Sequence, residues 1–534
     1  MSHQTGRPTP AQHISAGPLL SASLIISVSS LTSRFLGLLR DRLLAGTFGA
    51  GDSLDMYYAS FRIPDLIFNL LILGALSSAF IPVFKNYLSQ NKSAQAWHLA
   101  NNIIHILLII TLIICLIVFI FAHQFTAIIA PGFTPDQLAT TSYLTRIMLI
   151  SPLFFTISSI TGGILNSYKK FISYSLAPIM YNLGIIFGII FLVPTLSIYG
   201  LAIGVIIGAF LNLAVQIPEL YSIGYRYRFV IEPKNHDIKK IIMLTIPTMF
   251  SLAVAQINLT VDTIIASTLQ PGSISVINLA TNLFYIPIGV FAIPICTAVF
   301  PNLVEHISNH NVTQFSQQFS RSTKQILFVI IPSMIFLYIF RAQIVRILLG
   351  TGAFDWNDTA LTLTTLGYFA FSLPFQSLLP LITRGFYSTQ NTTKPLISSS
   401  ISMLSNIILS LSLTPYFGVS GLALSFTISS IINFLLLTYL FHHHLSHFRL
   451  RINNSIIQYA LVSIFAGIIA YLSLQAFEPF FNNNTLVGLF FQTALSSILG
   501  IVVYLSISYL LDIEELFLFT KIFRFSFFTN LFKK

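Results

Sequence analysis

The chain has 534 residues, of which 55% are hydrophobic and only 8% are charged, and its mean hydropathy is +0.82. A soluble protein of this length needs far more charge to cover its surface, so the composition excludes an ordinary soluble enzyme or binding domain.

Apolar stretches long enough to cross a bilayer recur along almost the whole chain. A spanning helix needs about 20 mostly apolar residues, and fourteen segments meet this requirement. These segments are residues 19–47, 53–88, 97–129, 138–166, 172–194, 199–223, 238–270, 273–303, 322–349, 358–388, 395–416, 419–442, 455–477 and 486–511. The sequence therefore predicts an all-α polytopic membrane protein of about 14 transmembrane helices.

The basic residues are distributed unevenly between the two sides of these segments. Twenty of the 27 lie in terminal segments, in connections or in the adjoining helix ends that alternate onto one side. An excess of Lys and Arg marks cytoplasmic loops, so both termini are predicted to be cytoplasmic. The net charge of +11 is thus interpreted as topology, and no nucleic-acid partner is predicted.

The first twelve helices are predicted to form two repeats of six. Pro194–Ala202 resembles Pro415–Ala423, 221 positions later, and Ala79–Pro82 resembles Ala298–Pro301, 219 positions later. Because six is an even number of spans, the two lobes have the same orientation and a pseudo-two-fold axis along the membrane normal, with a cleft between them. The predicted parts are a cytoplasmic tail (1–17), a first lobe (18–224), a cytoplasmic linker (225–237), a second lobe (238–446), and two extra helices with a cytoplasmic tail (447–534).

Seven arginines remain inside or at the ends of the predicted spans, namely Arg34, Arg40, Arg42, Arg62, Arg146, Arg341 and Arg346. A charge at the centre of a spanning helix costs about 2.5–3.5 kcal/mol on insertion scales, so each needs a partner, an aqueous cavity or a place at a helix end. Arg341 and Arg346 end the ninth helix, where long side chains can reach the interface. For Arg146, a site role and the same snorkelling are equal alternatives.

The first two predicted helices each carry a polar stripe along one face. The residues of these stripes are Ser33, Arg34, Gly37, Arg40 and Asp41 in the first helix, and Asp55, Tyr58, Arg62, Asp65 and Asn69 in the second. One interpretation is that the arginines and aspartates pair to lock the helices together. Because the guanidinium fork suits phosphate, we favour an anion site in the cleft.

Asp262 is the one acid in the interior of the predicted spans of the second lobe. Three roles remain open for it: a hydrogen-bonded structural acid, an ion pair with an arginine across the cleft, or help in holding a cation such as sodium. Cys115 and Cys296 lie in apolar stretches, and the histidine cluster at His442–His447 is interpreted as a solvated loop. No metal site, cofactor or enzymatic activity is predicted, since the sequence carries no phosphate-binding loop and no nucleophile with a base.

Several segments resemble the MurJ/MviN family over nearly the whole chain. The likeness is carried first by Ser33–Asp41, Phe48–Gly51, Asp55, Phe61–Leu66 and Gly74–Phe84, and then by Ala130–Phe133, Gly163–Asn166, Val261–Ser267 and Gly385–Ser388. That family belongs to the multidrug/oligosaccharidyl-lipid/polysaccharide exporter superfamily and flips lipid II, the undecaprenyl-pyrophosphate-linked precursor of peptidoglycan.

The resemblance implies a cationic cavity for pyrophosphate and sugar, alternating access, and a place in the bacterial cytoplasmic (inner) membrane. It implies lipid II or a similar undecaprenyl-pyrophosphate lipid as the substrate, and membrane lipids and cell-wall synthesis proteins as partners. The two extra helices are associated in the family with a groove for the lipid tail. By position, Arg34, Arg40, Asp41, Asp55 and Arg62 match family cavity residues. Together with Asp65 and Arg146 they form the predicted substrate-binding set.

This chain departs from the family pattern at three positions. Phe68 and Asn282 stand where the family usually has arginines, and Leu73 stands at the position of a glutamate. The fold expectation is unchanged, but three functions stay open. They are a lipid II flippase, an exporter of another lipid-linked saccharide or of a drug-like cation, and a degenerate flippase that serves as a scaffold.

Overall fold

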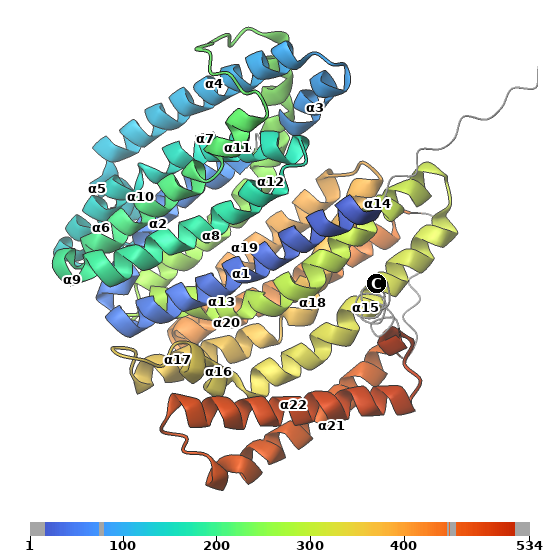
Figure 1. The fold of residues 1–534 in the computed structure, drawn as a ribbon. Coiled ribbons are helices and arrows are strands. Elements are labelled where there is room, and N and C mark those ends of the chain that lie inside the picture. The colour runs from blue at the N-terminus through green and yellow to red at the C-terminus, as the bar shows by residue number, and fades with distance from the viewer. Residues whose placement is uncertain (1–15, 74–79, 446–447, 449–454, 518–534) are drawn as a thin grey trace, which may run out of the picture.

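The computed structural model describes residues 16–73, 80–445, 448 and 455–517, and in these ranges helices are the only regular secondary structure. Figure 1 shows the helices lying roughly side by side, with the first lobe (blue to green) next to the second (yellow-green to orange) and a red C-terminal hairpin at the outer edge of the second.

The first lobe comprises α1 (Ala16–Phe48), α2 (Asp52–Ile67) with the π-helical turn η1 (Phe68–Leu73), α3 (Ile81–Ser89), α4 (Ser93–Ile120), α5 (Ala122–Ile129), α6 (Pro135–Met148), α7 (Ser151–Ser167), α8 (Phe171–Phe187) with the π-helical turn η3 (Gly188–Leu192), α9 (Val193–Leu196), α10 (Ile198–Ala214) and α11 (Ile217–Ser222).

The second lobe comprises α12 (His236–Ser267), α13 (Ser273–Pro287) with the π-helical turn η4 (Ile288–Ala292), α14 (Ile293–Ser308), α15 (Val312–Ile339), α16 (Arg341–Leu348), α17 (Trp356–Ala370), α18 (Leu373–Ser388), α19 (Thr393–Phe417) and α20 (Val419–His442). The C-terminal hairpin is α21 (Ser455–Phe477), the short η5 (Glu478–Phe480) and α22 (Leu486–Leu510).

Within the described residues, each of the fourteen predicted segments overlaps one or more of these helices. Within the described part of the chain, ten helices are long and apolar enough to span a membrane, and the pair α17–α18, bent by 48°, makes an eleventh if it counts as one span. Neither α1 nor α2 is among them. The four charged residues between Arg34 and Arg42 interrupt the apolar character of α1, as expected for a helix that faces a polar cavity. The count of fourteen spans stays a prediction.

The predicted start of the ninth segment, residue 322, is wrong by ten positions because α15 begins at Val312. Its first turns are rich in Gln and Ser, so they do not continue the apolar run from which the segment is predicted. They are nevertheless helical and packed. Phe315 and Phe319 are buried, and their rings contact those of Phe441 and Phe448 at centroid distances of 5.3–6.2 Å.

Backbone geometry repeats between the lobes and confirms the two-fold architecture. The helix after Pro64 is interrupted by η1, and the corresponding helix in the second lobe is interrupted at Pro287 by η4. A proline removes a backbone donor, so such breaks commonly follow it. Three turn residues with positive φ in the first lobe each have a counterpart 219 or 221 positions later. The pairs are Asn91 with His310, Lys169 with Gln390, and Ser197 with Gly418.

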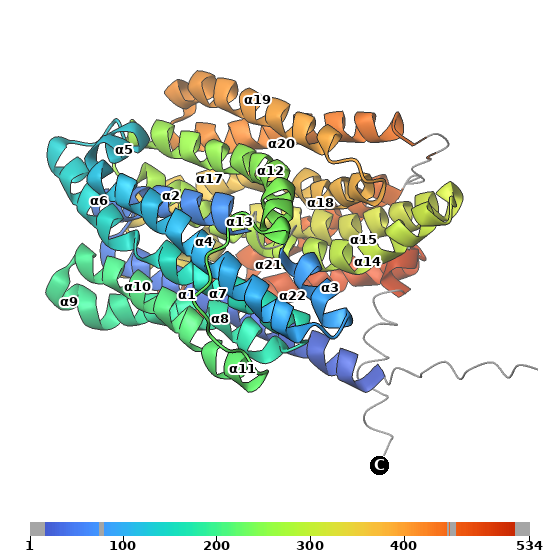
Figure 2. The same cartoon turned by 90° about the horizontal axis from the view of Figure 1, so that it is seen from above.

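The lobes meet along α1, α2, α12 and α13. Helix α2 packs on α13, and α12 packs on α13 and α19 of its own lobe but also on α5 and η1 of the first lobe. Figure 2 accordingly shows α12 between the two groups of helices. The hairpin α21–α22 packs on α15 and α16, where the Tyr504 hydroxyl donates to the Phe328 carbonyl oxygen at 2.7 Å.

Ser197 and Gly418 allow a test of the backbone strain at the positive-φ turn that the two lobes share. Both have φ near +50° and ψ near −140°, a region where L-residues are strained. A Cβ on Gly418 meets nothing within 4 Å, so Gly418→Ala should cost only the backbone strain, about 1–3 kcal/mol. We expect a lower melting temperature in detergent. Ser197→Ala is the matched control and should leave it unchanged; equal melting temperatures for both variants and the parent would contradict the prediction.

Candidate substrate-binding cavity

The polar stripes of α1 and α2 meet at a cavity of about 260 Å³ between the lobes. This interlobe cavity is lined from the first lobe by Arg40, Tyr57, Tyr58, Arg62, Asp65 and Tyr181, and from α13 by Asn278 and Asn282. Three of the predicted site residues, Arg40, Arg62 and Asp65, therefore line one cavity.

Arg40 is neutralised by its neighbour Asp41. Its Nε and Nη2 donate to Asp41 Oδ1 at 3.0 and 2.8 Å, and its Nη1 donates to Asn182 Oδ1 at 3.2 Å. The other carboxylate oxygen of Asp41 accepts from Asn282 Nδ2 of the second lobe at 2.9 Å. These contacts use three of the five guanidinium donors. Within the described ranges, this is the only arginine–carboxylate pair within 4.0 Å.

Arg62 links the lobes through neutral partners. Its Nε donates to Thr263 Oγ1 on α12 at 2.7 Å, and its Nη2 donates to Asn278 Oδ1 on α13 at 2.8 Å. Asp65 and Asp262 attract it electrostatically without direct contact. Hydrogen bonds to a charged group contribute about 1.5–3 kcal/mol, so these two bonds favour the present arrangement of the lobes.

Asp55 lies outside the interlobe cavity, although the sequence analysis assigned it to substrate binding. Its carboxylate accepts from the backbone N–H of Gly272 at 2.8 Å, and from the N–H and hydroxyl of Ser275 at 2.7 and 2.6 Å. It thereby caps the N-terminus of α13, where the helix dipole favours a negative charge. The contact joins the first lobe to the second.

Backbone contacts around Asp55 close this end of the cleft, which we call the end seal. The Ala50 N–H donates to Asp358 Oδ2 at 2.9 Å, and the Ala353 N–H donates to the Gly46 carbonyl at 2.8 Å. A Cβ on Gly272, whose φ is +90°, would lie 1.9 Å from the Ala50 carbonyl oxygen. The two lobes therefore touch backbone to backbone at the end seal.

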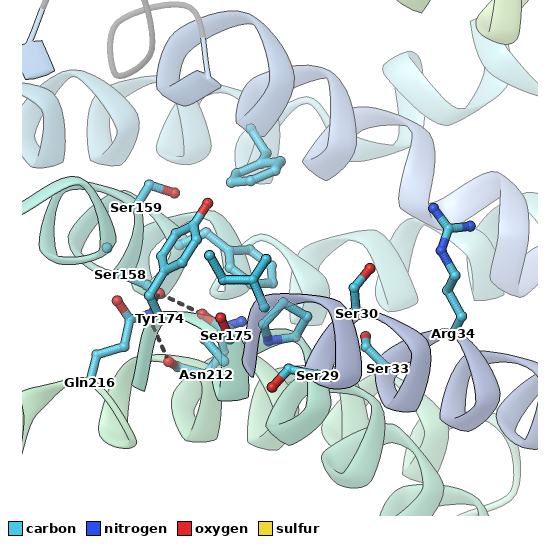
Figure 3. Close-up of a pocket in the computed structure, with 16 residues that line it drawn as sticks. Ser29, Ser30, Ser33, Arg34, Ser158, Ser159, Tyr174, Ser175, Asn212 and Gln216 are labelled. Carbon is cyan, nitrogen blue, oxygen red and sulfur yellow. Dashed lines mark hydrogen bonds between the residues drawn. The ribbon is translucent and has the colours of Figure 1, made fainter. Parts of the chain in front are cut away.

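Arg34 lies near the middle of α1, six residues closer than Arg40 to the end beside most of the basic loops. Its guanidinium rests against Gly289 in η4 of the second lobe, since a Cβ there would come within 2.1–2.3 Å of its terminal atoms. Among the described residues, no carboxylate lies within 4.0 Å of it. Arg34 lines a second cavity of about 470 Å³, inside the first lobe (Figure 3).

Two further predicted residues lie apart from these cavities. Arg146 Nε donates to the Phe119 carbonyl at 3.1 Å, and its guanidinium lies over the rings of Phe119 and Tyr143 at 5.6 and 5.5 Å. It lines neither cavity. Asp262 accepts from Asn406 Nδ2 at 3.2 Å, and the same amide donates to Asn258 at 2.9 Å.

The three positions that depart from the family pattern have different surroundings. Asn282 donates to Asp41, and Phe68 stacks with Phe155 at 5.1 Å between ring centres. The side chain of Leu73 lies outside the described part of the structure. Sequence analysis missed Asn182 and Asn278, which hold Arg40 and Arg62. Lone amides within apolar spans are costly unless bonded, and that signal could have identified both.

Two helical lobes around a polar cavity, joined at one end by the end seal, define a two-lobed polytopic membrane transporter. A transporter of the multidrug resistance MATE family in an inward-facing conformation shares this fold. Its TM-score is 0.65 at 14% identity, with coverage of 77% of this chain and 95% of that one.

The similarity to lipid II flippases is closer. A solved structure of lipid II flippase MurJ in an inward closed conformation has a TM-score of 0.78 and 28% identity, and covers 91% of this chain and 98% of that one. The family model described as lipid II flippase MurJ matches residues 44–507.

Two curated relatives agree. The probable lipid II flippase MurJ of Vibrio cholerae is 31% identical over 431 residues, 78% of this chain and 82% of the relative. That of Buchnera aphidicola subsp. Schizaphis graminum is 30% identical over 505 residues, 92% and 97% respectively. The chain belongs to the MurJ family, as the resemblance predicted.

The end seal predicts a conformational effect of Asp55→Ala. Removing the carboxylate leaves the donors of Gly272 and Ser275 without their partner, so the sealed state should lose population. We expect longer distances between spin labels placed at Thr134 and Gln270, measured by double electron–electron resonance with Cys115 and Cys296 replaced by Ala. Asp52→Ala, on the exposed side of the same helical turn, is the control. Unchanged distances in Asp55→Ala would show that the carboxylate does not hold the seal.

Proposed function

We propose that this protein flips lipid II across the bacterial cytoplasmic membrane for peptidoglycan synthesis, by alternating access between its two lobes. The relatives named above are lipid II flippases or probable lipid II flippases. The observation that carries the proposal is a line of half-buried arginines on α1 and α2 at the lobe interface, of which Arg34 and Arg62 have no carboxylate within 4.0 Å among the described residues.

In this proposal Arg34 supplies the net positive charge for the pyrophosphate. Arg40 is already balanced by Asp41, yet it retains donors that an anion can share. The two arginines are six residues apart on one helix, a rise of about 9 Å. Arg34 lines the cavity inside the first lobe and Arg40 lines the interlobe cavity, and bidentate arginine contacts suit the oxygens of a diphosphate.

We propose that the end with the basic loops faces the cytoplasm, together with both termini, as the positive-inside rule predicts. The end seal then faces the outside, and the headgroup is admitted from the cytoplasmic side. Transport to the other side requires the seal at Asp55 to open and the bonds of Arg62 to Thr263 and Asn278 to break.

Asp262 is assigned a supporting role. Its carboxylate is held by the Asn406 amide and attracts Arg62 electrostatically. Of the three predicted roles, these contacts favour a hydrogen-bonded acid that stabilises Arg62 in the present lobe arrangement. Membrane lipids remain expected partners from the exposed apolar helix faces, and contacts with cell-wall synthesis proteins remain an expectation.

A related exporter of another lipid-linked saccharide is the second candidate, and one observation favours it. Phe68 and Asn282 place an aromatic ring and an amide beside the cavities, where the family pattern has arginines. A scaffold without transport activity is the third candidate. It predicts that reversing the charge of Arg34 has no effect on growth.

Arg34→Ala should abolish growth when the variant is the only lipid II flippase in a depletion strain, because the uncompensated cation is lost. Arg40→Ala should reduce growth less because Arg34 is kept, although the variant also leaves Asp41 unpaired. Arg146→Ala is the matched control and should complement fully. Membrane levels are compared by immunoblotting, and full complementation by Arg34→Ala at normal levels argues against the proposed function.

Asn282→Arg should strengthen binding of lipid II. A second arginine beside Asp41 would compete for its carboxylate and release donors of Arg40 to the substrate. A gain of about 1.4 kcal/mol corresponds to tenfold tighter binding. The dissociation constant is measured by native mass spectrometry, with Asn282→Gln, which keeps an amide, as the control. A weaker or unchanged affinity in Asn282→Arg contradicts this reasoning.

A further inference from the structure

The cavity inside the first lobe is lined by nine residues with hydroxyl or amide side chains together with several apolar residues, and we call it the serine pocket. It lies between α1, α7, α8 and α10 and has a volume of about 470 Å³, within the range of small-molecule sites. Its serines are Ser29, Ser30, Ser33, Ser158, Ser159 and Ser175. Figure 3 shows the serines of α1 on one side and those of α7 and α8 on the other.

The wall formed by α7 and α10 is held rigidly. Gln216 Nε2 donates to Ser158 Oγ at 2.6 Å, and Ser158 Oγ donates to Asn212 Oδ1 at 2.5 Å. The same Gln216 amide also donates to the Asn212 carbonyl at 3.0 Å. All three residues are buried. A network whose members hold one another presents its remaining polar atoms in fixed positions.

Two buried polar atoms of the pocket lack a partner within the described structure, Gln216 Oε1 and Ser175 Oγ. An unsatisfied buried polar group costs about 1–3 kcal/mol, and a bound ligand with hydroxyl or amide groups removes that cost. Gly162 leaves room beside Gln216 Oε1, because a Cβ there would lie 3.2 Å from that atom. Gln216 is 2% exposed, so its side-chain oxygen lies in the interior of the first lobe.

The serine pocket is connected to the arginine site through α1 and α8. Asn182 Nδ2 donates to Ser33 Oγ at 3.4 Å, and Asn182 Oδ1 accepts from Arg40 at 3.2 Å. Arg34 lines the same pocket, and Figure 3 shows that Ser30 and Arg34 point to the same side of α1. A ligand with its phosphates on Arg34 can therefore extend toward the serines.

The chemistry of the lining selects the class of ligand. Among the described residues, Arg34 is the only charged one that lines the pocket, so neither a cation nor a second anionic group finds a partner deeper inside. Hydroxyl and amide groups donate and accept alternately, and the rings of Phe68, Phe155 and Tyr174 add apolar faces. This combination suits a sugar ring, which carries hydroxyl groups at its edge and C–H groups on its faces.

We propose that the serine pocket binds the uncharged saccharide part of a lipid-linked pyrophosphate whose phosphates lie on Arg34. The inference rests on the proposed function and assigns a separate group of residues to the sugar. The pocket then distinguishes a saccharide-bearing lipid from the bare lipid pyrophosphate, which the arginines alone cannot do.

The experiment compares two ligands, lipid II and undecaprenyl pyrophosphate, by native mass spectrometry of the full chain. Ser30→Leu adds bulk to the pocket from a side chain that is exposed, and Ser159→Leu fills it from α7. We expect wild-type protein to bind lipid II more tightly than undecaprenyl pyrophosphate. Both variants should weaken lipid II binding at least tenfold and change undecaprenyl pyrophosphate binding less than twofold. Arg34→Ala should weaken both ligands.

Ser412→Leu, an equally exposed serine on α19, is the control and should change neither affinity. Melting temperatures show whether each variant is folded. Because there are two independent pocket variants, the test still stands if one of them does not fold. Unchanged lipid II affinity in both pocket variants overturns the inference, as does equal weakening of both ligands. If wild-type protein binds neither ligand, or if Arg34→Ala has no effect, the proposed function fails and the saccharide subsite fails with it.

Discussion

A hydrocarbon interior supplies no partners for charges or backbone polar groups, and the whole structure is arranged around that constraint. Three of the charged side chains that α1 and α2 bring to the lobe interface are held by hydrogen-bond partners in the structure. Arg40 has Asp41 and Asn182, Arg62 has Thr263 and Asn278, and Asp55 has the N-terminus of α13. Arg34 is the exception, because it rests on Gly289 with no carboxylate beside it in the described structure.

The interactions between the lobes are strong enough to define a state and weak enough to be reversed. The end seal consists of a few hydrogen bonds, each of which contributes about 0.5–1.5 kcal/mol, or somewhat more when a carboxylate accepts. Two conformations of a transporter must differ by only a few kcal/mol if a substrate is to shift their populations. A hydrogen-bonded seal, supplemented by Arg62, suits that requirement better than a large buried apolar interface.

The sequence left two interpretations of the membrane arginines open, structural pairing and an anion site, and the observed contacts agree in part with each. Arg40 pairs with a carboxylate, as the structural interpretation predicted, and Asp55 serves the joint between the lobes. Arg40 and Arg62 nevertheless line a cavity, as the anion-site interpretation predicted. Arg146 lies apart from both cavities, beside Phe119 and Tyr143, which agrees with the snorkelling alternative. Charge and periodicity alone did not distinguish the roles of Arg40, Asp55, Arg62 and Arg146, because all four are charged residues within predicted apolar segments.

The sequence by itself determined the helical segments, the polar stripes and the two-fold repeat, since each depends on local periodicity or on similarity between short segments. It could not determine that Asp55 caps α13, that Asn182 holds Arg40, or that six serines from three helices enclose one pocket. These contacts join residues more than a hundred positions apart, and they depend on how helices rotate and cross. The π-helical turns after Pro64 and near Pro287 change that rotation. Only the tertiary structure therefore decided which polar residues meet and which face lipid.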